Sequence, residues 1–335
     1  MKKTYYLFNP GRLSRKDNTL KFTVVDRKGS DGATKYIPIE GVSDLFCFGS
    51  LDANSALYTF LGKAGIAVHF FDYYEHYRGS FMPKEYLLAG KMQIEQTKHY
   101  IDRKKRLELA RKFVMGAAFN MIKNLRYYIN RERDLEEIQR NIEKYATLIP
   151  ESYKIDELMG IEGNIRQAYY TAFDEIISAD FAMENRSKRP PQNEINALIS
   201  FGNMMCYTLC LGQIYHTQLN PTISFLHEPG YRRYSLALDV AEIFKPLLVD
   251  RLIFRLLNKR EIKVNDFDHQ LNNCTLKDSG RKTFVRAWEE KLNETFKHPV
   301  LKRSVSYKHL VRLECYKLSK HILNMGEYQP FKARW

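Results

Sequence analysis

The sequence predicts an α+β protein in which a small β-rich N-terminal domain, residues 1–82, precedes a larger all-helical domain, residues 83–335. A length of 335 residues exceeds what a single hydrophobic core comfortably accommodates, so two domains are expected. The first eighty residues contain short runs of β-branched and aromatic residues bounded by turn residues. From Lys84 onward, apolar residues recur at helical spacing almost to the end.

Four short runs in the first domain have the composition of strands, and one segment between them has the pattern of a short capped helix. The expected strands cover residues 21–25, 35–39, 45–48 and 66–71, and the expected helix covers residues 52–61. The pattern breaks at residues 78–83, where we place the domain boundary. The last ten residues are expected to form a loosely held tail.

The charge of the chain indicates a polyanionic partner. Lys and Arg number 53 against 39 acids, which gives a formal net charge of +14 at pH 7. Such an excess favours nucleic acid or an anionic membrane surface, with an ordinary basic enzyme as the alternative. No uninterrupted apolar run approaches the ~20 residues that span a bilayer, and no apolar signal-peptide region follows Met1, so we expect a cytoplasmic protein without membrane association. The five cysteines form no CxxC pair and are expected to be reduced.

Residues 84–133 concentrate the basic charge in a helical stretch, with thirteen Lys or Arg against five acids. Tyr100, Tyr127 and Tyr128 are interleaved with these cations. Lys and Arg neutralise phosphates and tyrosines stack on bases, so the stretch is a candidate nucleic-acid surface. A solvated helix face is the alternative interpretation.

Three separate segments carry residues suited to chemistry. Glu162, in the run GIEGNIRQAYY, is expected in the first turn of a long helix through Phe181, where an acid also favours the helix dipole. His227 precedes Pro229-Gly230 and therefore belongs to a loop. In the following helix, which Ser235 is expected to cap, Asp239 and Glu242 share one face within an apolar sequence.

Burial of two carboxylates requires a compensating cation. An ion pair with Lys245 or Arg232 would suffice, but a divalent ion is the sharper hypothesis. A site of Glu162, His227 and the Asp239/Glu242 pair has no thiolate, so it does not suit structural zinc; it suits Mg²⁺ or Mn²⁺. The sequence has no Walker loop, GxGxxG, HExxH or GxSxG motif that would indicate other chemistry.

The segments GIEGNIRQAYY, RPPQNEINALISFGN and FLHEPGYRRYSLALDVAEIFKP, in this order, resemble the CRISPR-associated endonuclease/integrase, the larger of the two universal spacer-acquisition proteins. The resemblance extends over essentially the whole chain. It implies a homodimer with an N-terminal β-domain for dimerisation and assembly and a helical catalytic domain. It also implies that Glu162, His227 and Glu242 bind the metal, with Asp239 as a supporting acid; Lys245 stands where relatives often have Arg.

The implied reaction joins short foreign DNA fragments into a CRISPR repeat array, when a 3′-hydroxyl attacks a phosphodiester; with water, the same site would act as a nuclease on double-stranded or branched DNA. Arg166, Arg232, Arg233 and Lys245 are candidate DNA contacts. The implied partner is the small second CRISPR acquisition protein, which bridges two dimers. Two other hypotheses stay open: a stand-alone metal-dependent DNA repair nuclease, and a non-catalytic nucleic-acid-binding scaffold.

Overall fold

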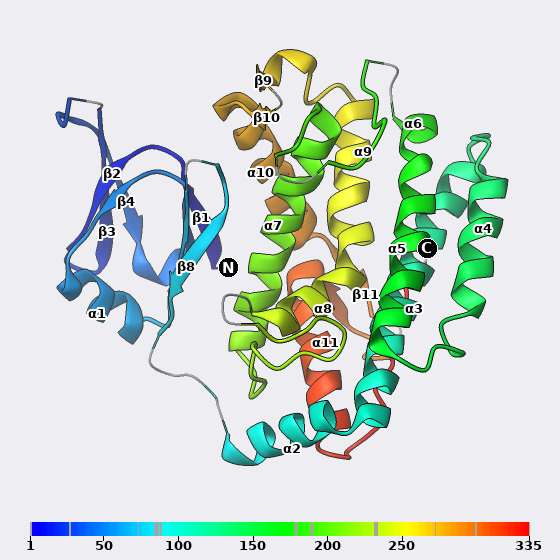
Figure 1. Ribbon diagram of the computed structural model, residues 1–335. Helices are drawn as coiled ribbons and strands as arrows, with labels where there is room; N and C mark the ends of the chain where they lie inside the picture. Colours follow the sequence, from blue (N-terminus) through cyan, green and yellow to red (C-terminus); the bar gives the residue numbers. More distant parts are fainter. Residues whose placement is uncertain are drawn as a thin grey trace. The chain divides into compact units, whose positions relative to one another are not determined.

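The computed structural model describes the chain except residues 1, 27, 73, 84–86, 88, 178–179, 188–189, 231–233, 272, 299 and 335. The chain divides into two compact units, Met1–Tyr86 and Leu87–Trp335 (Figure 1). This boundary lies four residues beyond the one drawn from the sequence. The predicted α+β class, with strands first and helices after, is confirmed.

The first unit contains two four-stranded sheets and one helix. In one sheet, with the order β1-β5-β7-β8, the first three strands are parallel and β8 is antiparallel to β7. In the other, with the order β4-β3-β2-β6, β2 and β6 are parallel and the other pairs are antiparallel. The bounds are β1 Lys3–Leu7, β2 Gly11–Lys16, β3 Thr19–Val25, β4 Asp31–Pro38, β5 Val42–Cys47, β6 Leu51–Asp52, α1 Ser55–Lys63, β7 Ala67–Phe71 and β8 Tyr77–Phe81.

The four expected strands and the expected helix correspond to β3, β4, β5, β7 and α1. Helix α1 begins at Ser55, three residues later than expected, because the Asn54 side chain caps it by accepting a hydrogen bond from the Leu57 backbone N–H at 3.0 Å. The alternating inward side chains of the strands, including Leu13, Leu20 and Leu45, form a core with Leu57 and Leu61 of α1. The strands β1, β2, β6 and β8 were not predicted.

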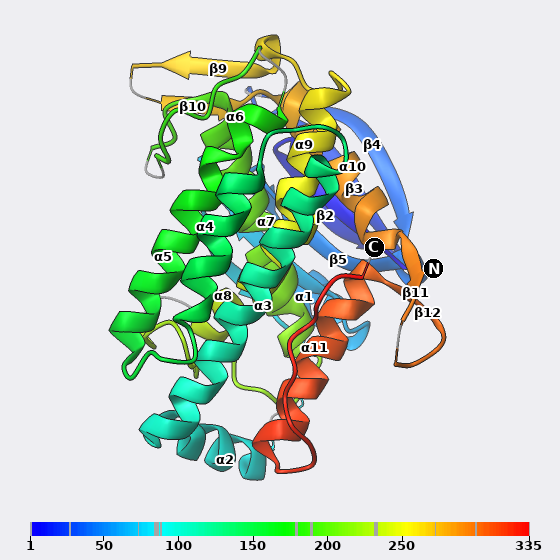
Figure 2. The same ribbon diagram turned by 90° about the vertical axis from the view of Figure 1, so that its right-hand side faces the viewer.

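The second unit is predominantly helical, and Figures 1 and 2 show its long helices running side by side. Its α-helices are α2 Gly90–Ile101, α3 Arg103–Ile129, α4 Glu136–Thr147, α5 Ile155–Thr171, α6 Phe173–Ile176, α7 Glu194–Tyr215, α8 Ser235–Phe244, α9 Arg251–Asn258, α10 Asp278–Asn293 and α11 Tyr307–Ile322. A π-helical turn, Lys245–Asp250, joins α8 to α9. Two short antiparallel hairpins, which the helical pattern did not predict, are β9 Phe267–Gln270 with β10 Asn273–Leu276, and β11 Thr295–Lys297 with β12 Ser304–Ser306.

Helix α7 forms the centre of the second unit. Among the described residues it is the one helix with the length and apolar composition of a membrane span, but 78% of its most apolar window is buried inside the protein. Cys206 and Cys210 lie on it and are buried, and all five cysteines are free. A helix that is apolar on all sides and covered by its neighbours is a core helix.

Three expectations about local structure in this unit are wrong. Glu162 lies in the middle of α5, and the helix ends at Thr171 instead of continuing through Phe181, which lies outside any helix. Ser235 is the first residue of α8, and its hydroxyl donates to the Thr222 carbonyl oxygen at 3.0 Å instead of capping the helix. The C-terminal segment is firmly held, since Tyr328 and Ala333 are fully buried.

Asn120 of α3 attaches the C-terminal segment to the carbonyl end of α8. Its side-chain amide donates to the carbonyl oxygens of Ile243, at 3.0 Å, and Phe331, at 3.1 Å. Its side-chain oxygen accepts from the Ala333 backbone N–H at 3.0 Å. The side chain is fully buried, so no water replaces these three bonds. Asn120 therefore connects three segments that are far apart in the sequence.

We predict that Asn120→Ala destabilises the helical unit by about 3 kcal/mol, because it leaves buried backbone groups without partners. The free energy of unfolding, measured by urea denaturation, tests this expectation. Asn141→Ala is the matched control, since Asn141 is an exposed asparagine on α4. A loss no larger in Asn120→Ala than in this control would contradict the structural role.

Candidate active site

The two carboxylates that the sequence placed in separate helices meet at one cation. Arg166 lies one helical turn after Glu162 on α5, so both side chains point from the same face. Arg166 Nε lies 2.8 Å from Glu162 Oε1, and Arg166 Nη2 pairs with Glu242 Oε2 of α8. The exposed fractions are 13% for Arg166, 15% for Glu162 and 7% for Glu242. The guanidinium thus joins α5 to α8 in a nearly dry environment.

Glu242 has a second cationic partner, Lys245, whose Nζ pairs with its Oε1. Burial alone would raise the pKa of Glu242, but the charges of Arg166 and Lys245, with a smaller contribution from His227, lower the pKa to about 2. Glu242 is therefore ionised at neutral pH. The sequence analysis offered an ion pair with Lys245 as an alternative to a divalent ion, and Glu242 forms this pair. Glu242 also pairs with Arg166, which the sequence analysis did not indicate.

Asp239, three residues before Glu242, has a different function. Its Oδ2 accepts from the backbone N–H groups of Phe225 and Leu226 at 2.7 and 3.0 Å. Its Oδ1 accepts from the backbone N–H of His227 at 3.0 Å and from the His227 Nδ1 at 2.8 Å. The carboxylate is fully buried. It consequently fixes both the loop and the orientation of the imidazole, whose Nε2 has no hydrogen-bond partner among the residues that the structure describes.

The loop that carries His227 is also held from α2 and α3, a role that sequence reasoning did not predict for these residues. The fully buried Gln96 donates to the carbonyl oxygens of Asn220 and Ile223 and accepts from the Asn220 N–H, at 2.7–2.9 Å. Arg106 donates to the Phe225 carbonyl oxygen at 3.0 Å and pairs with Glu228. Tyr100 donates to Glu228 at 2.6 Å. Two members of the basic, tyrosine-containing stretch therefore position the His227 loop.

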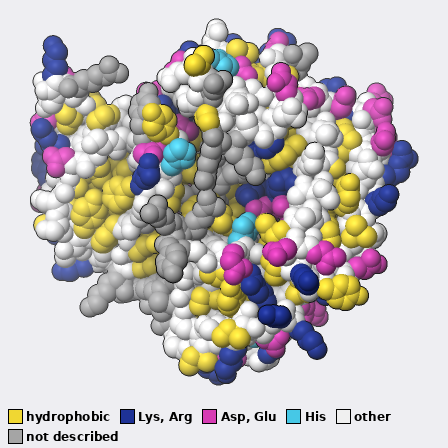
Figure 3. Space-filling model, in the orientation of Figure 1, with side chains coloured by type: hydrophobic (Ala, Val, Ile, Leu, Met, Phe, Trp, Pro, Cys, Tyr) yellow, Lys and Arg dark blue, Asp and Glu magenta, His cyan; other side chains and the backbone are white. Residues whose placement is uncertain are grey.

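The chemistry of the donor set fits a divalent metal ion. Glu162 and Glu242 turn oxygens toward one cation, and His227 is oriented by a carboxylate, as metal-bound histidines commonly are. Within the described part of the chain, however, no three acids, histidines or cysteines lie close enough together to hold an ion. In this structure the Arg166 guanidinium lies between the two glutamates. On the face shown in Figure 3, a histidine and charged side chains of both signs gather in a hollow of the helical unit.

The candidate DNA contacts fall into two groups. Arg166 and Lys245 form ion pairs with the site carboxylates, whereas Arg232 and Arg233 lie outside the described residues. In the basic stretch, Arg103, Lys104 and Lys105 are exposed at the beginning of α3, where Asp102 caps the helix by accepting from the backbone N–H groups of Lys104 and Lys105. These three side chains are exposed, whereas Arg106 holds the His227 loop.

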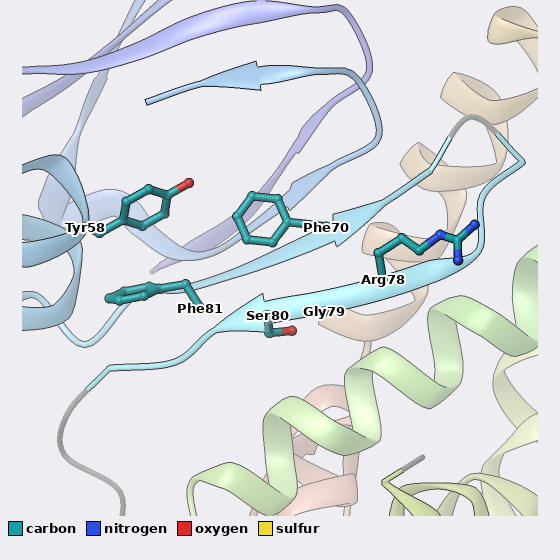
Figure 4. Close-up of a pocket in the computed structure, with 6 residues that line it drawn as sticks. All are labelled: Tyr58, Phe70, Arg78, Gly79, Ser80 and Phe81. Carbon is teal, nitrogen blue, oxygen red and sulfur yellow. The ribbon is translucent and has the colours of Figure 1, made fainter. Parts of the chain in front are cut away.

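The strand-rich unit has an open pocket between α1 and the strands β7 and β8 (Figure 4). Aromatic rings of Tyr58, Phe70 and Phe81 form most of its wall, with Arg78 at one side. None of its six lining residues is an acid, a histidine or a cysteine, so it offers neither a general base nor a set of metal ligands.

We predict that His227 stabilises the metal-free protein more at low pH than at high pH. Burial lowers the pKa of His227, but the hydrogen bond to Asp239 and the charges of Asp239 and Glu242 outweigh this effect and raise the pKa above its ordinary value. The stabilisation is thus complete below about pH 6.5, the value for an unfolded chain, and disappears as the pH rises through the folded-state pKa.

Thermal unfolding of wild type and His227→Gln in EDTA, at pH 6 and pH 9, measures this difference. The loss of stability should be larger at pH 6, and an Asp239→Asn background should remove the pH dependence because Asp239 is its principal favourable cause. An equal loss at both pH values would contradict the prediction.

Comparison with known proteins assigns the chain to a family. The family model "CRISPR associated protein Cas1" matches residues 5–290. A "CRISPR-associated endonuclease Cas1" of Thermodesulfovibrio yellowstonii is 49% identical, over 99% of this chain and 100% of the relative. One of Fusobacterium nucleatum is 44% identical, over 100% of this chain and 98% of the relative.

Solved structures agree with this assignment. A Cas1 protein from Thermotoga maritima superposes with a TM-score of 0.84 and 39% identity, over 99% of this chain and 100% of that one. A casposase bound to its integration product has the same TM-score at 19% identity, over 99% and 93% of the two chains, and shows that the fold is shared. The family match and the full-length relatives establish that the chain belongs to the Cas1 family of CRISPR-associated proteins.

Proposed function

We propose that this chain is a divalent-metal-dependent DNA endonuclease and integrase that joins short foreign DNA into a CRISPR repeat array. The observation that carries the proposal is the convergence of Glu162 and Glu242 on one cation, together with the orientation of the His227 imidazole by Asp239. Glu162, His227 and Glu242 are the proposed ligands for Mg²⁺ or Mn²⁺, and Asp239 positions His227. Relatives named as endonucleases, at 40–49% identity over the full chain, support the same activity.

In the proposed reaction, the 3′-hydroxyl of the incoming DNA attacks a phosphodiester of the target. A new P–O bond forms, the bond to the departing 3′-oxygen breaks, and the proton of the attacking hydroxyl is balanced by protonation of the departing oxygen. When bound, the metal ion supplies charge stabilisation at the phosphate and lowers the pKa of the attacking hydroxyl. The protein holds the reacting groups in line and excludes water from the buried carboxylates.

Two roles are divided among the charged residues of the helical unit. The ionised Glu242, with its pKa near 2, stays available to a cation across the physiological pH range. Lys245 beside it and the exposed cations Arg103, Lys104 and Lys105 are candidates for phosphate contacts, as are Arg166 and the arginines at positions 232 and 233. Affinity for DNA would then come from many cations, and catalysis from one small site.

We expect Glu162→Ala and His227→Ala to abolish cleavage and strand joining while they preserve most of the DNA affinity. Each removes a proposed ligand, whereas affinity is dominated by phosphate neutralisation elsewhere. A gel assay for cleavage and joining, with DNA binding measured in parallel at a fixed salt concentration, tests this. Glu175→Ala is the matched control, because Glu175 is an exposed acid of α6. Full joining activity in Glu162→Ala would refute the ligand assignment.

Arg166 and Lys245 neutralise the buried glutamates without a metal ion. This arrangement is also what we expect if the chain is a non-catalytic nucleic-acid-binding scaffold. Metal-dependent cleavage by the wild type separates the scaffold from both enzymes. Strand joining to a repeat-bearing target separates the integrase from a stand-alone repair nuclease. The loss of either activity in the ligand variants then assigns it to this site.

We propose further that the chain acts as a cytoplasmic homodimer, in which the strand-rich unit serves assembly, and that a small second acquisition protein bridges two dimers. A complex titled Cas6-RT-Cas1–Cas2 includes a chain with this fold, with a TM-score of 0.83 at 17% identity, over 36% of that longer chain. A single basic subunit has no evident feature that would select DNA fragments by length. We therefore expect length selection to require a larger assembly.

The purified chain should accordingly sediment as a dimer and join DNA fragments with poor length selectivity. Addition of the small partner should produce a larger complex and a narrower distribution of integrated lengths. Analytical ultracentrifugation and integration assays with a mixture of fragment lengths measure both effects. Identical length distributions with and without the partner would argue against a bridging role.

A further inference from the structure

Glu228, the residue directly after His227, is an exposed acid that two residues of the basic helical stretch hold. Its Oε1 accepts from the Tyr100 hydroxyl at 2.6 Å, and its Oε2 accepts from Arg106 Nη2. The exposed fraction is 69% for the Glu228 side chain and 14% for that of Arg106. The two hydrogen bonds lower the pKa of Glu228, which is therefore ionised at neutral pH. The carboxylate is thus an anion at the surface, bound by two donors.

The Arg106 guanidinium is held in place by contacts that do not involve Glu228. Its Cζ lies 4.5 Å from the centroid of the Tyr100 ring, and its Nε donates to the Phe225 carbonyl oxygen at 3.0 Å. Stacking on a ring and a backbone hydrogen bond fix the plane of a guanidinium, so its remaining N–H groups are positioned for an anion. Three more exposed cations lie within one turn of Arg106 at the beginning of α3: Arg103, Lys104 and Lys105.

The loop that carries His227 does not depend on Glu228 either. The Asp239 carboxylate accepts three backbone N–H groups of the loop, and the Gln96 side chain makes three further hydrogen bonds with it. An ion pair as exposed as that of Glu228 contributes less than about 1 kcal/mol to stability. Glu228 can therefore leave its two donors while the loop and Arg106 stay in place.

We propose that Tyr100 and Arg106 form a binding site for a phosphate of the DNA backbone, which Glu228 occupies in the free protein and leaves when DNA binds. This rests on the DNA-binding part of the proposed function. A carboxylate and a phosphodiester both offer two oxygens to a hydroxyl and a guanidinium, so the exchange leaves neither donor without a partner. Glu228 lowers the affinity for DNA because it competes for the same donors. A phosphate bound here connects the DNA to the His227 loop.

Removal of the competing acid should strengthen DNA binding. Glu228→Ala should bind duplex DNA about fivefold more tightly than the wild type. Glu327→Ala is the matched control, because Glu327 is 65% exposed and pairs with Lys112, a 16% exposed cation of the same helix α3. It changes the net charge equally, but it should alter the affinity by less than about twofold.

A second comparison tests whether Glu228 and the DNA use the same donor. In the wild type, Tyr100→Phe removes a hydrogen bond from both the Glu228-occupied and the DNA-bound state, so the affinity should change little. In Glu228→Ala the hydroxyl serves the DNA alone, and the same substitution should weaken binding about threefold. A purely structural role of Tyr100 would give the same effect in both backgrounds.

Fluorescence anisotropy of a labelled DNA duplex, titrated with the full-length protein in EDTA at a fixed salt concentration, measures these affinities. Because no metal ion is present, the result does not depend on the ligand assignment. Glu228→Ala that binds no more tightly than Glu327→Ala overturns the proposal, and so does an equal effect of Tyr100→Phe in both backgrounds. Glu228→Gln, which should also bind more tightly, decides the question if thermal unfolding shows that Glu228→Ala is not folded. Wild-type protein that binds no duplex DNA overturns the DNA-binding function and, with it, this proposal.

Discussion

The helical unit depends on the neutralisation of acids that its own packing removes from water. Glu242 and Asp239 lie three residues apart on α8 and are almost fully buried, yet each is neutralised differently. Glu242 is paired with two side-chain cations, while Asp239 accepts three backbone N–H groups and one imidazole N–H. One acid can therefore exchange partners, and the other is committed to holding a loop. Under the proposed function, this division distinguishes the ligand Glu242 from Asp239, which supports His227.

The residues of the candidate site could be named from the sequence, but their pairings could not. Carboxylates in an apolar helix and a histidine before a Pro-Gly turn are local signals, and they identified Asp239, Glu242 and His227. Arg166 contacts Glu242 across 76 residues, and this pairing depends on how α5 and α8 are arranged in three dimensions. In the same way, the sequence near Arg106 shows many cations and indicated a nucleic-acid surface. It did not indicate the ion pair of Arg106, because the partner residue, Glu228, is 122 residues away.

For the fold as well, features set by local sequence periodicity could be predicted, whereas short or context-dependent elements could not. The sheets and long helices follow from periodicity, but hairpins with three or four residues per strand, such as β11 and β12, give too few alternations to be recognised. The expected helix through Phe181 failed because α5 ends at Thr171, although the apolar spacing continues beyond it. Pro246 lacks the N–H that would continue the α8 hydrogen-bond ladder, and the chain enters the π-helical turn there.

The bonds of Asn120 have a consequence for biosynthesis. Residues 120 and 243 are translated well before residues 331 and 333, yet all four are joined through one buried amide next to Glu242. The surroundings of the carbonyl end of α8 are therefore complete only after the ribosome has synthesised the C-terminal segment. A nascent chain, or one shortened by premature termination before residue 328, lacks these bonds, so the surroundings of the candidate site are complete only after synthesis has passed these residues.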